Sequence, residues 1–272
     1  MFAALFYGAA DFCGGLATRR SAMLAVTLFS QAAGFVVFLI VRPLIPGHAV
    51  ASDYVFGALG GACGGIGILL LYHALSIGKM GVVSPITAVI AAALPLGVGI
   101  ARGEHLSGAQ IVGLALALIA IVLISISEER RGTREIATAG VREALASGVA
   151  IGGFYLFLSY THPAARLDNL IAARAASVGI LLAIALVTRS QLRANRADWP
   201  LIAGAGLLDM TANALYVLAT FNGYLSIAAV LTSLYPASTV LLARIVLSER
   251  LSGIQKAGVV FALAGVVLVS LR

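Results

Sequence analysis

The chain has 272 residues, of which 61% are hydrophobic and only 11% charged, and its formal net charge is +7. Soluble domains carry about 45–50% apolar and about 25% charged residues, so this composition excludes a soluble enzyme, a disordered chain and a disulfide-rich secreted domain. The basic residues lie in short clusters between long apolar runs, which is typical of membrane loops and not of a nucleic-acid-binding surface. Cys13 and Cys63 fall inside apolar runs and are interpreted as packing residues.

Ten apolar segments follow one another along the chain, and each is long enough, or nearly so, to cross a bilayer core of about 30 Å as a helix. Longer connections occur only near 43–53, 128–142 and 188–199. Backbone polar groups in lipid must be satisfied within the segment, so apolar runs of this length predict helices. The sequence therefore predicts an all-α polytopic membrane protein with ten transmembrane helices, at 1–17, 24–42, 54–75, 82–101, 107–127, 143–161, 168–187, 200–221, 225–247 and 253–271.

A shift of 145 residues aligns the two halves of the chain. Residues 104–113 (EHLSGAQIVG) match residues 249–258 (ERLSGIQKAG), and 11 of 22 positions are identical from 104 to 125. Because each half holds five spans, an odd number, the second half enters the membrane from the opposite side. Inverted repeats of this kind recur in secondary transporters that work by alternating access. The predicted organisation is a first five-helix repeat, a linker and a second five-helix repeat, at 1–127, 128–142 and 143–272.

Several of these residues resemble a known family. The duplicated Glu-x-Leu-Ser-x-x-Gln-x-x-Gly element, Tyr7-Gly8 in the first span and Leu234-Tyr235-Pro236 in the ninth are similar to the EamA-type branch of the drug/metabolite transporter superfamily. The resemblance implies a ten-helix bundle with a central cavity lined mainly by helices 1, 3, 4, 6, 8 and 9. It also implies export or exchange of small metabolites, often amino acids or related compounds. The first half has Ala91 where the second has Pro236, so the fourth and ninth spans are expected to bend at different heights.

The duplicated element itself is interpreted as structural. In each copy a serine and a glutamine three residues later have the spacing of a capping box, and a glutamate precedes the same helix amino terminus, where the helix dipole favours negative charge. The residues are Glu104, Ser107 and Gln110 in one copy and Glu249, Ser252 and Gln255 in the other.

The third span carries a stripe of glycines. Gly57, Gly61 and Gly65 follow at four-residue spacing, with Gly60 and Gly64 beside them. Small residues so arranged let helix backbones approach closely in lipid. The stripe therefore predicts a face of α-helix packing.

Ionisable side chains within apolar helices are costly and point to function. Three such residues are candidates for proton coupling: Asp209, Asp11 and His73. For each, the alternative is a buried structural hydrogen-bond partner, and for His73 that alternative is favoured because it lies near the end of its span. Tyr7 lies one helical turn before Asp11, and Asn213 and Tyr216 lie four and seven residues after Asp209, so each set is expected on one face of its helix. The predicted substrate-binding residues are Tyr7, Asp11, Tyr72, Asp209, Asn213, Tyr216 and Tyr235.

Two arginines lie within or near the ends of predicted spans and are not interpreted as proton-coupling residues. Arg174 and Arg244 are expected to extend their side chains to the membrane interface. Pairing of Arg174 with Asp209 is the alternative. Tyr155 and Tyr160 either line a cavity or pack in interfacial belts.

No motif of an enzyme is present: the sequence has no His-Glu-x-x-His, no Gly-x-Ser-x-Gly and no Gly-x-x-x-x-Gly-Lys. We therefore predict a non-enzymatic secondary transporter, an exporter or exchanger of small organic metabolites in the plasma membrane, without cofactor or metal. Its predicted partners are the small-molecule substrate, the lipid bilayer and protons as a candidate coupling ion, with the chain acting as a monomer or homodimer and binding no nucleic acid. The alternatives are a translocator of lipid-linked or sugar conjugates and a non-transporting membrane scaffold.

Loop charges and the resemblance disagree about orientation. Connections after odd-numbered spans carry 13 Lys and Arg residues, against 4 on the other side. The positive-inside rule then places both termini outside, whereas the resemblance implies that both are cytoplasmic.

Overall fold

The computed structural model describes residues 1–77, 80–125, 140–247 and 252–270, and within them every regular element is helical. The predicted all-α fold is confirmed over this part of the chain, and most of the predicted linker 128–142 lies outside it. The α-helices are α1 (Phe2–Ala17), α2 (Met23–Val41), α3 (Ala51–Ile77), α4 (Met80–Ala101), α5 (Gly108–Ser125), α6 (Val141–Ser159), α7 (Asn169–Val187), α8 (Trp199–Asn222), α9 (Leu225–Thr232), α10 (Tyr235–Leu247) and α11 (Gly253–Ser270). Short 3-10 helices are η1 (Arg42–Leu44), η2 (Pro163–Ala165) and η3 (Arg196–Asp198).

Within the described residues, each predicted segment corresponds to one helix except 225–247, which forms two. α9 ends at Thr232 and α10 begins at Tyr235. A continuous helix would need the nitrogen of residue 236 to donate to the carbonyl of Thr232, but Pro236 has no N–H and its ring clashes with that carbonyl. The expected bend of the ninth span therefore takes the form of a break between two helices, directly before this proline. The first half has Ala91 at the equivalent position, and α4 continues through it.

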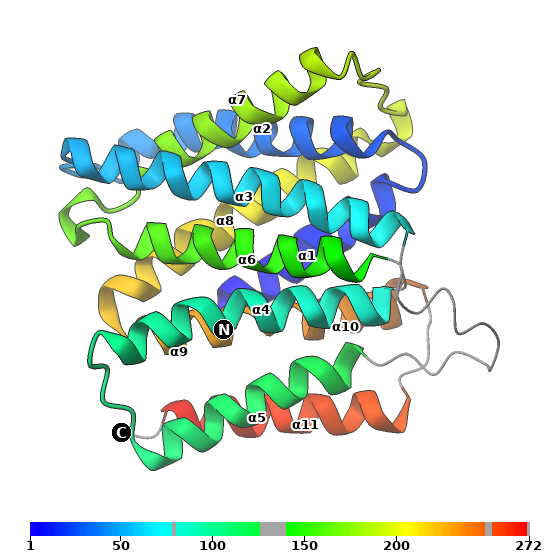
Figure 1. The fold of residues 1–272 in the computed structure, drawn as a ribbon. Helices are drawn as coiled ribbons and strands as arrows, with labels where there is room; N and C mark the ends of the chain where they lie inside the picture. The colour runs from blue at the N-terminus through cyan, green and yellow to red at the C-terminus, as the bar shows by residue number, and fades with distance from the viewer. Residues whose placement is uncertain (78–79, 126–139, 248–251, 271–272) are drawn as a thin grey trace.

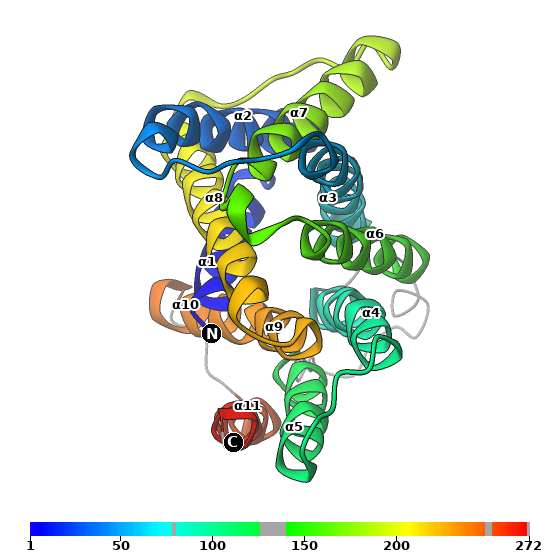
Figure 2. The same cartoon turned by 90° about the vertical axis from the view of Figure 1, so that its left-hand side faces the viewer.

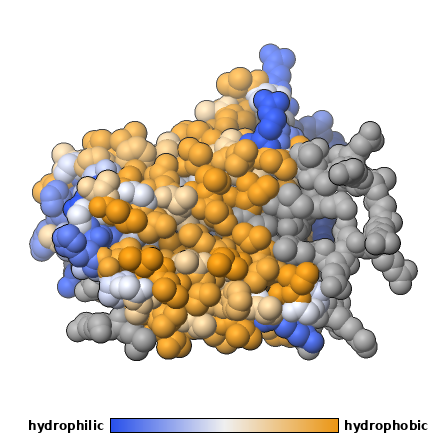
Figure 3. Space-filling model, turned by 60° about the horizontal axis from the view of Figure 1, so that its bottom comes forward, coloured by the Kyte–Doolittle hydropathy of each residue, from blue (hydrophilic) through white to orange (hydrophobic). Residues whose placement is uncertain are grey.

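The surface of the bundle is that of a membrane protein. Figure 3 shows a broad hydrophobic surface across the middle of one side, with hydrophilic residues towards its ends. Soluble monomers rarely expose apolar patches larger than a few hundred Å², so the chain is a membrane-embedded, multi-pass protein. Among the described helices, five are long and apolar enough to span a membrane and the other apolar helices are shorter. The five are Met23–Leu44, Ala51–Ala74, Val141–Ser159, Asn169–Val187 and Arg196–Phe221.

The helices lie side by side, and their connections gather at two opposite ends of the bundle (Figure 1). One end, the α2–α3 face, carries the connections 42–50, 102–107 and 160–168. The opposite end, the α1–α2 face, carries 18–22 and 188–198. α1 and α6, the first helices of the two halves, run in opposite directions between these faces (Figure 1).

Packing joins the two halves in a paired pattern. α3 packs against α6 and α7, and α8 packs in the same way against α1 and α2. α4 packs against α6, as α10 does against α1. α5 and α11 pack on each other at one edge of the bundle, where Figure 2 shows them side by side. The helices of each half therefore have their main neighbours in the other half.

The approach of α3 to α7 depends on glycine. A Cβ atom added to Gly61 would lie 1.9 Å from the carbonyl oxygen of Ala173, and Gly57 and Gly65 also lie against the α7 backbone. Gly60 faces α6 instead, where an added Cβ would make an ordinary contact at 3.5 Å. The predicted packing role of the glycine stripe is confirmed.

The duplicated capping boxes form as predicted. The Ser107 backbone nitrogen donates to Gln110 Oε1 at 2.9 Å, and the Gln110 nitrogen donates to Ser107 Oγ at 3.3 Å. Ser252 and Gln255 make the same pair of bonds at 3.1 and 3.2 Å. Both fifth helices, α5 and α11, therefore begin with the same reciprocal cap.

Glu104 acts at a different helix from the one predicted. Its carboxylate accepts hydrogen bonds from the backbone nitrogens of Leu225 at 2.7 Å and Ser226 at 3.2 Å, and from the Ser226 hydroxyl. It thereby caps the amino terminus of α9, in the other half, where the first N–H groups have no partner within the helix. The predicted role at the start of α5 is wrong for this residue, and Glu249, its counterpart, lies outside the described residues.

Candidate functional site

A cavity lies between the two halves at mid-depth in the bundle. Its volume is about 50 Å³, measured as the space open to the centres of water-sized spheres. One water needs about 10–15 Å³ of such space, so the cavity has room for several waters or a small solute group. The lining comes from α1, α2, α3, α6, α7, α8 and α10, and its polar side chains are Tyr7, Asp11, Gln31, Tyr155, Arg174, Ser177, Asp209, Asn213 and Tyr235.

Arg174 of α7 is the central cation of this cavity. Its side chain is 6% exposed, and its guanidinium forms an ion pair with the Asp209 carboxylate of α8. A second nitrogen donates to Gln31 Oε1 of α2, and Nε contacts the Met210 sulfur at 3.2 Å. The expectation that Arg174 extends to the membrane interface is wrong, because the guanidinium finds these partners inside the bundle. The alternative, pairing with Asp209, is confirmed.

Hydrogen bonds extend this ion pair to both sides. Asn213 Nδ2 donates to the Asp209 carbonyl at 2.8 Å and to its carboxylate at 3.3 Å. The Tyr7 hydroxyl of α1 donates to Asn213 Oδ1. On the other side, Ser177 Oγ donates to Gln31 Oε1 at 2.9 Å. The network thus joins α1 and α2 of the first half to α7 and α8 of the second.

Asp11 of α1 lines the same cavity one helical turn from Tyr7. Within the described residues, its carboxylate has no hydrogen-bond or ion-pair partner. This second carboxylate therefore differs from Asp209, whose charge is balanced by an arginine.

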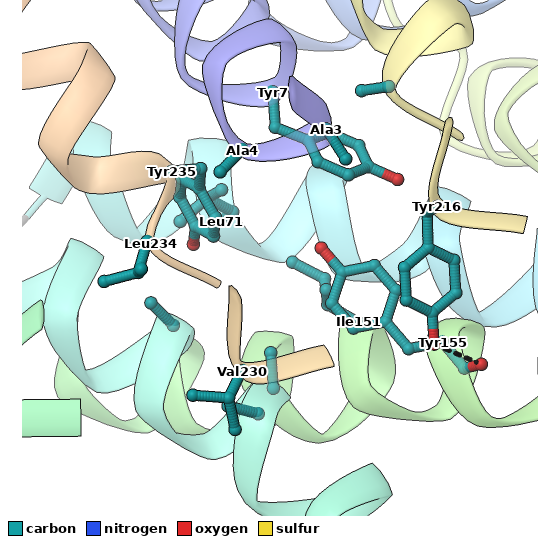
Figure 4. Close-up of a cluster of buried hydrophobic side chains, with 14 of the residues drawn as sticks. Ala3, Ala4, Tyr7, Leu71, Ile151, Tyr155, Tyr216, Val230, Leu234 and Tyr235 are labelled. Atoms are coloured by element: carbon teal, nitrogen blue, oxygen red, sulfur yellow. Dashed lines mark hydrogen bonds between the residues drawn. The ribbon is translucent and has the colours of Figure 1, made fainter. Parts of the chain in front are cut away.

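Tyrosines from four helices cluster at the cavity, with Tyr7, Tyr155 and Tyr235 in its lining and Tyr216 behind it (Figure 4). The rings of Tyr7 and Tyr155 meet edge to face with centroids 6.2 Å apart, and Tyr155 packs on Tyr216 at 4.6 Å. The Tyr216 hydroxyl donates to the Tyr155 carbonyl at 2.9 Å, so it is directed away from the cavity (Figure 4). Tyr235 is 4% exposed, and its hydroxyl has no hydrogen-bond partner among the described residues.

An ion pair and a carboxylate–histidine contact join the two halves at the α2–α3 face. Arg42 makes a two-pronged ion pair with Asp168, with N···O distances of 2.8 and 2.9 Å, and the Asp168 side chain is only 2% exposed. Asp53 accepts from the backbone nitrogen of His162 at 2.8 Å and lies 2.9 Å from its ring Nδ1. Both pairs join the connection 42–50 and the start of α3 to the connection 160–168.

Aromatic contacts and a backbone bond reinforce this closure. The Tyr160 ring stacks on Phe56 with centroids 5.2 Å apart, and the Arg102 guanidinium lies 4.0 Å from the Tyr160 centroid. The His48 nitrogen donates to the Ala164 carbonyl at 2.8 Å. Several independent contacts therefore join the two halves at the α2–α3 face.

The opposite face is joined by fewer and mostly uncharged contacts in the described residues. Ser21 Oγ donates to the Asp198 carboxylate at 2.7 Å and accepts from the Asn195 nitrogen at 2.9 Å. The Ala22 nitrogen donates to the Arg193 carbonyl at 3.0 Å. These bonds join the connections 18–22 and 188–198.

Comparison with known proteins relates the sequence of the chain to a transporter family. Residues 139–271 match the EamA-like transporter family. This match over the second half of the chain confirms its resemblance to EamA-type transporters. A solved structure described only as "Crystal structure of protein" aligns with the EamA-like chain at a TM-score of 0.80 and 15% identity, over 99% of this chain and 94% of that chain. At this identity the likeness shows the fold alone, and no curated protein matches the chain. Since the family is one of membrane transporters, the protein transports small solutes across a membrane.

The predicted site residues of this EamA-like protein fall into two groups. Five line the cavity together: Tyr7, Asp11, Asp209, Asn213 and Tyr235. The others are outside the lining: Tyr216 and Tyr72 are buried behind it, the Tyr72 hydroxyl lying against Gly14 of α1, and His73 is exposed on α3.

Two other residues considered in the sequence analysis, Tyr160 and Arg244, are not part of the cavity lining as described. Tyr160 is 40% exposed and belongs to the closure of the α2–α3 face. The side chain of Arg244 lies outside the described residues. Among the described residues, no group of three or more His, Cys, Asp or Glu side chains has the arrangement of a metal site.

The lining differs from the one that the family resemblance implies. α2 and α7 contribute Gln31, Arg174 and Ser177, whereas none of the described α4 residues lines the cavity. Gln31 is the one amide side chain in α2, a helix whose other polar residues are the small Thr27 and Ser30. That large polar side chain within a membrane span is the signal that could have identified α2 as part of the site.

Proposed function

We propose that this EamA-like protein is a secondary transporter, an exporter or exchanger, of small organic metabolites such as amino acids or related compounds in the plasma membrane. The observation that carries the proposal is the cavity, in which charged and polar side chains of both halves meet inside an apolar bundle. Polar groups at membrane depth are costly and usually mark a pathway for substrates or ions. The sequence has no phosphate-binding loop for ATP, which favours secondary transport.

We further propose that the protein works by alternating access between two inverted five-helix repeats. The paired packing of α3 and α8, and the opposite directions of α1 and α6, support the inversion. Two aspartates at equivalent positions support it too. Asp53 and Asp198, 145 residues apart, each stand at the start of a third helix of their half and each accept hydrogen bonds from the other half's connection. They do so at opposite faces of the bundle.

In this mechanism the α2–α3 face is the closed gate. For the cavity to open there, the Arg42–Asp168 pair and the Asp53–His162 contacts must separate. Opening would re-expose these charges to water, which compensates for the lost contacts. The ion pair is partly solvent-accessible on the Arg42 side, at 34% exposure, so its separation is inexpensive compared with that of the buried Arg174–Asp209 pair.

Flux through the purified protein in liposomes tests the proposal. A metabolite panel is first screened by thermal stabilisation, and uptake of the stabilising solutes is then measured. Asn213→Ala, which removes the link between Tyr7 and Asp209, should lower uptake about tenfold or more if it costs a buried hydrogen bond to the charged pair. Thr211→Ala, on an exposed side of the same helix, is the matched control and should transport normally. A folded wild-type protein that moves no solute would contradict the proposal.

A further inference from the structure

The cavity holds more negative than positive side chains. Its three charged residues are two carboxylates and one guanidinium, Asp11, Asp209 and Arg174. Each guanidinium nitrogen of Arg174 already has a partner, and one of those partners is Asp209. The pair is therefore neutral as a unit. The acidic group that remains available to a solute is Asp11, whose carboxyl has no such partner among the described residues.

The wall around Asp11 is aromatic. Tyr7, Phe154, Tyr155 and Tyr235 line the same cavity from three different helices, and Figure 4 shows the three tyrosines in one cluster of buried side chains. Faces of aromatic rings attract cations, and such rings are a recurrent means of binding alkylammonium groups. Tyr235 also lines the cavity, and its buried hydroxyl has no hydrogen-bond partner among the described residues, so it can bond to a solute.

A solute that carries a carboxylate fits this cavity poorly. Its carboxylate would need a cationic donor, and Arg174 is the only cation among the described lining residues. To free Arg174, the solute would have to displace Asp209, which would then be a buried charge without a partner. Leaving one member of a buried pair uncompensated is strongly unfavourable.

We propose that the cavity selects a small organic ammonium cation without a carboxylate. Asp11 holds the ammonium charge, and the rings of Tyr7, Tyr155 and Tyr235 contact its alkyl groups. This inference rests on the proposed transport function. Of the small metabolites proposed above it retains amines and quaternary ammonium compounds, and it excludes the amino acids because they carry a carboxylate.

Binding of matched probes to the purified full-length protein tests the charge preference. Choline and ethanolamine are the ammonium probes, 3,3-dimethylbutan-1-ol is the uncharged isostere of choline, and glycine betaine adds a carboxylate to the same ammonium group. Calorimetry should show binding of at least one ammonium probe, and binding of the isostere and betaine about 10- to 100-fold weaker, as expected for loss of a charge-assisted contact. Binding of neither ammonium probe, or tighter binding of betaine, would overturn the inference.

Variants separate the role of Asp11 from folding. Asp11→Asn should weaken binding of the ammonium probe about 10- to 100-fold, whereas Asp11→Glu should retain it and Thr211→Ala should leave it unchanged. Unaltered affinity of Asp11→Asn would overturn the role of this residue. Measurement of solute flux in liposomes distinguishes failure of the ammonium preference from failure of the proposed transport function. If the protein moves amino acids but no ammonium probe, the inference fails and the transport function stands; if a folded protein moves no solute, the proposed function itself fails.

Discussion

The contact between α3 and α7 gives the most exacting prediction for the fold. Gly61→Ala places a Cβ atom 1.9 Å from the carbonyl oxygen and 2.5 Å from the Cα of Ala173. Both are backbone atoms, so no side-chain rotation relieves the clash and the two helices must move apart. Overpacking of this kind costs about 1–3 kcal/mol, while replacing a helical glycine by alanine returns about 0.5–1 kcal/mol. We expect a net loss of about 1–2 kcal/mol.

Gly60→Ala is the matched control, one residue away on the same helix. Its Cβ would meet Leu158 at an ordinary 3.5 Å, so only the gain in helix propensity remains and stability should be unchanged or slightly higher. Thermal unfolding in detergent, followed by fluorescence of the single tryptophan, Trp199, compares the two variants. The Gly61→Ala protein should unfold roughly 2–8 °C below the wild type. Equal unfolding temperatures for the two variants would refute the packing argument.

Three further predictions concern charged residues. Arg174→Gln leaves Asp209 buried without its cation and should lower the free energy of unfolding by about 3–5 kcal/mol. Addition of Asp209→Asn to this variant should recover most of that loss. A double variant no more stable than the single one would count against the ion pair. Glu104→Ala removes the cap of α9 and should cost about 0.5–2 kcal/mol, measured by thermal unfolding, and no change would show that the cap is dispensable. Arg42→Ala or Asp168→Asn should raise hydrogen exchange in the connections 42–50 and 160–168, and unchanged exchange would exclude this pair as the closure.

Much of the fold follows from local sequence. Apolar runs of about twenty residues specify their helices without reference to the rest of the chain, and the four-residue spacing of Gly57, Gly61 and Gly65 was enough to predict a close helix contact. A bend of the ninth span was expected from Pro236, but not that it would divide the span into two separate helices. What the sequence did not reveal is which helix each glycine meets, because that depends on the order in which ten segments assemble.

The site was less accessible to sequence reasoning because its partners are far apart in the chain. Arg174 meets Asp209 and Gln31, which lie 35 and 143 residues away, and the same arginine near a helix end would extend to the interface if those partners were absent. Asp53 was unremarkable in the sequence, since an acidic residue in the first turn of a helix is common. Only the assembled bundle brings it to His162 in the other half.

Reversible locking of the α2–α3 face tests the central claim, that solutes pass through the cavity as the two faces open in turn. The backbones of His48 and Ala164 are joined by a hydrogen bond of 2.8 Å, which suits a disulfide between His48→Cys and Ala164→Cys in a chain whose Cys13 and Cys63 are replaced by alanine. In liposomes, oxidation of this variant should abolish solute flux, and reduction should restore it. Flux at the wild-type rate through the oxidised, fully cross-linked protein would contradict the mechanism.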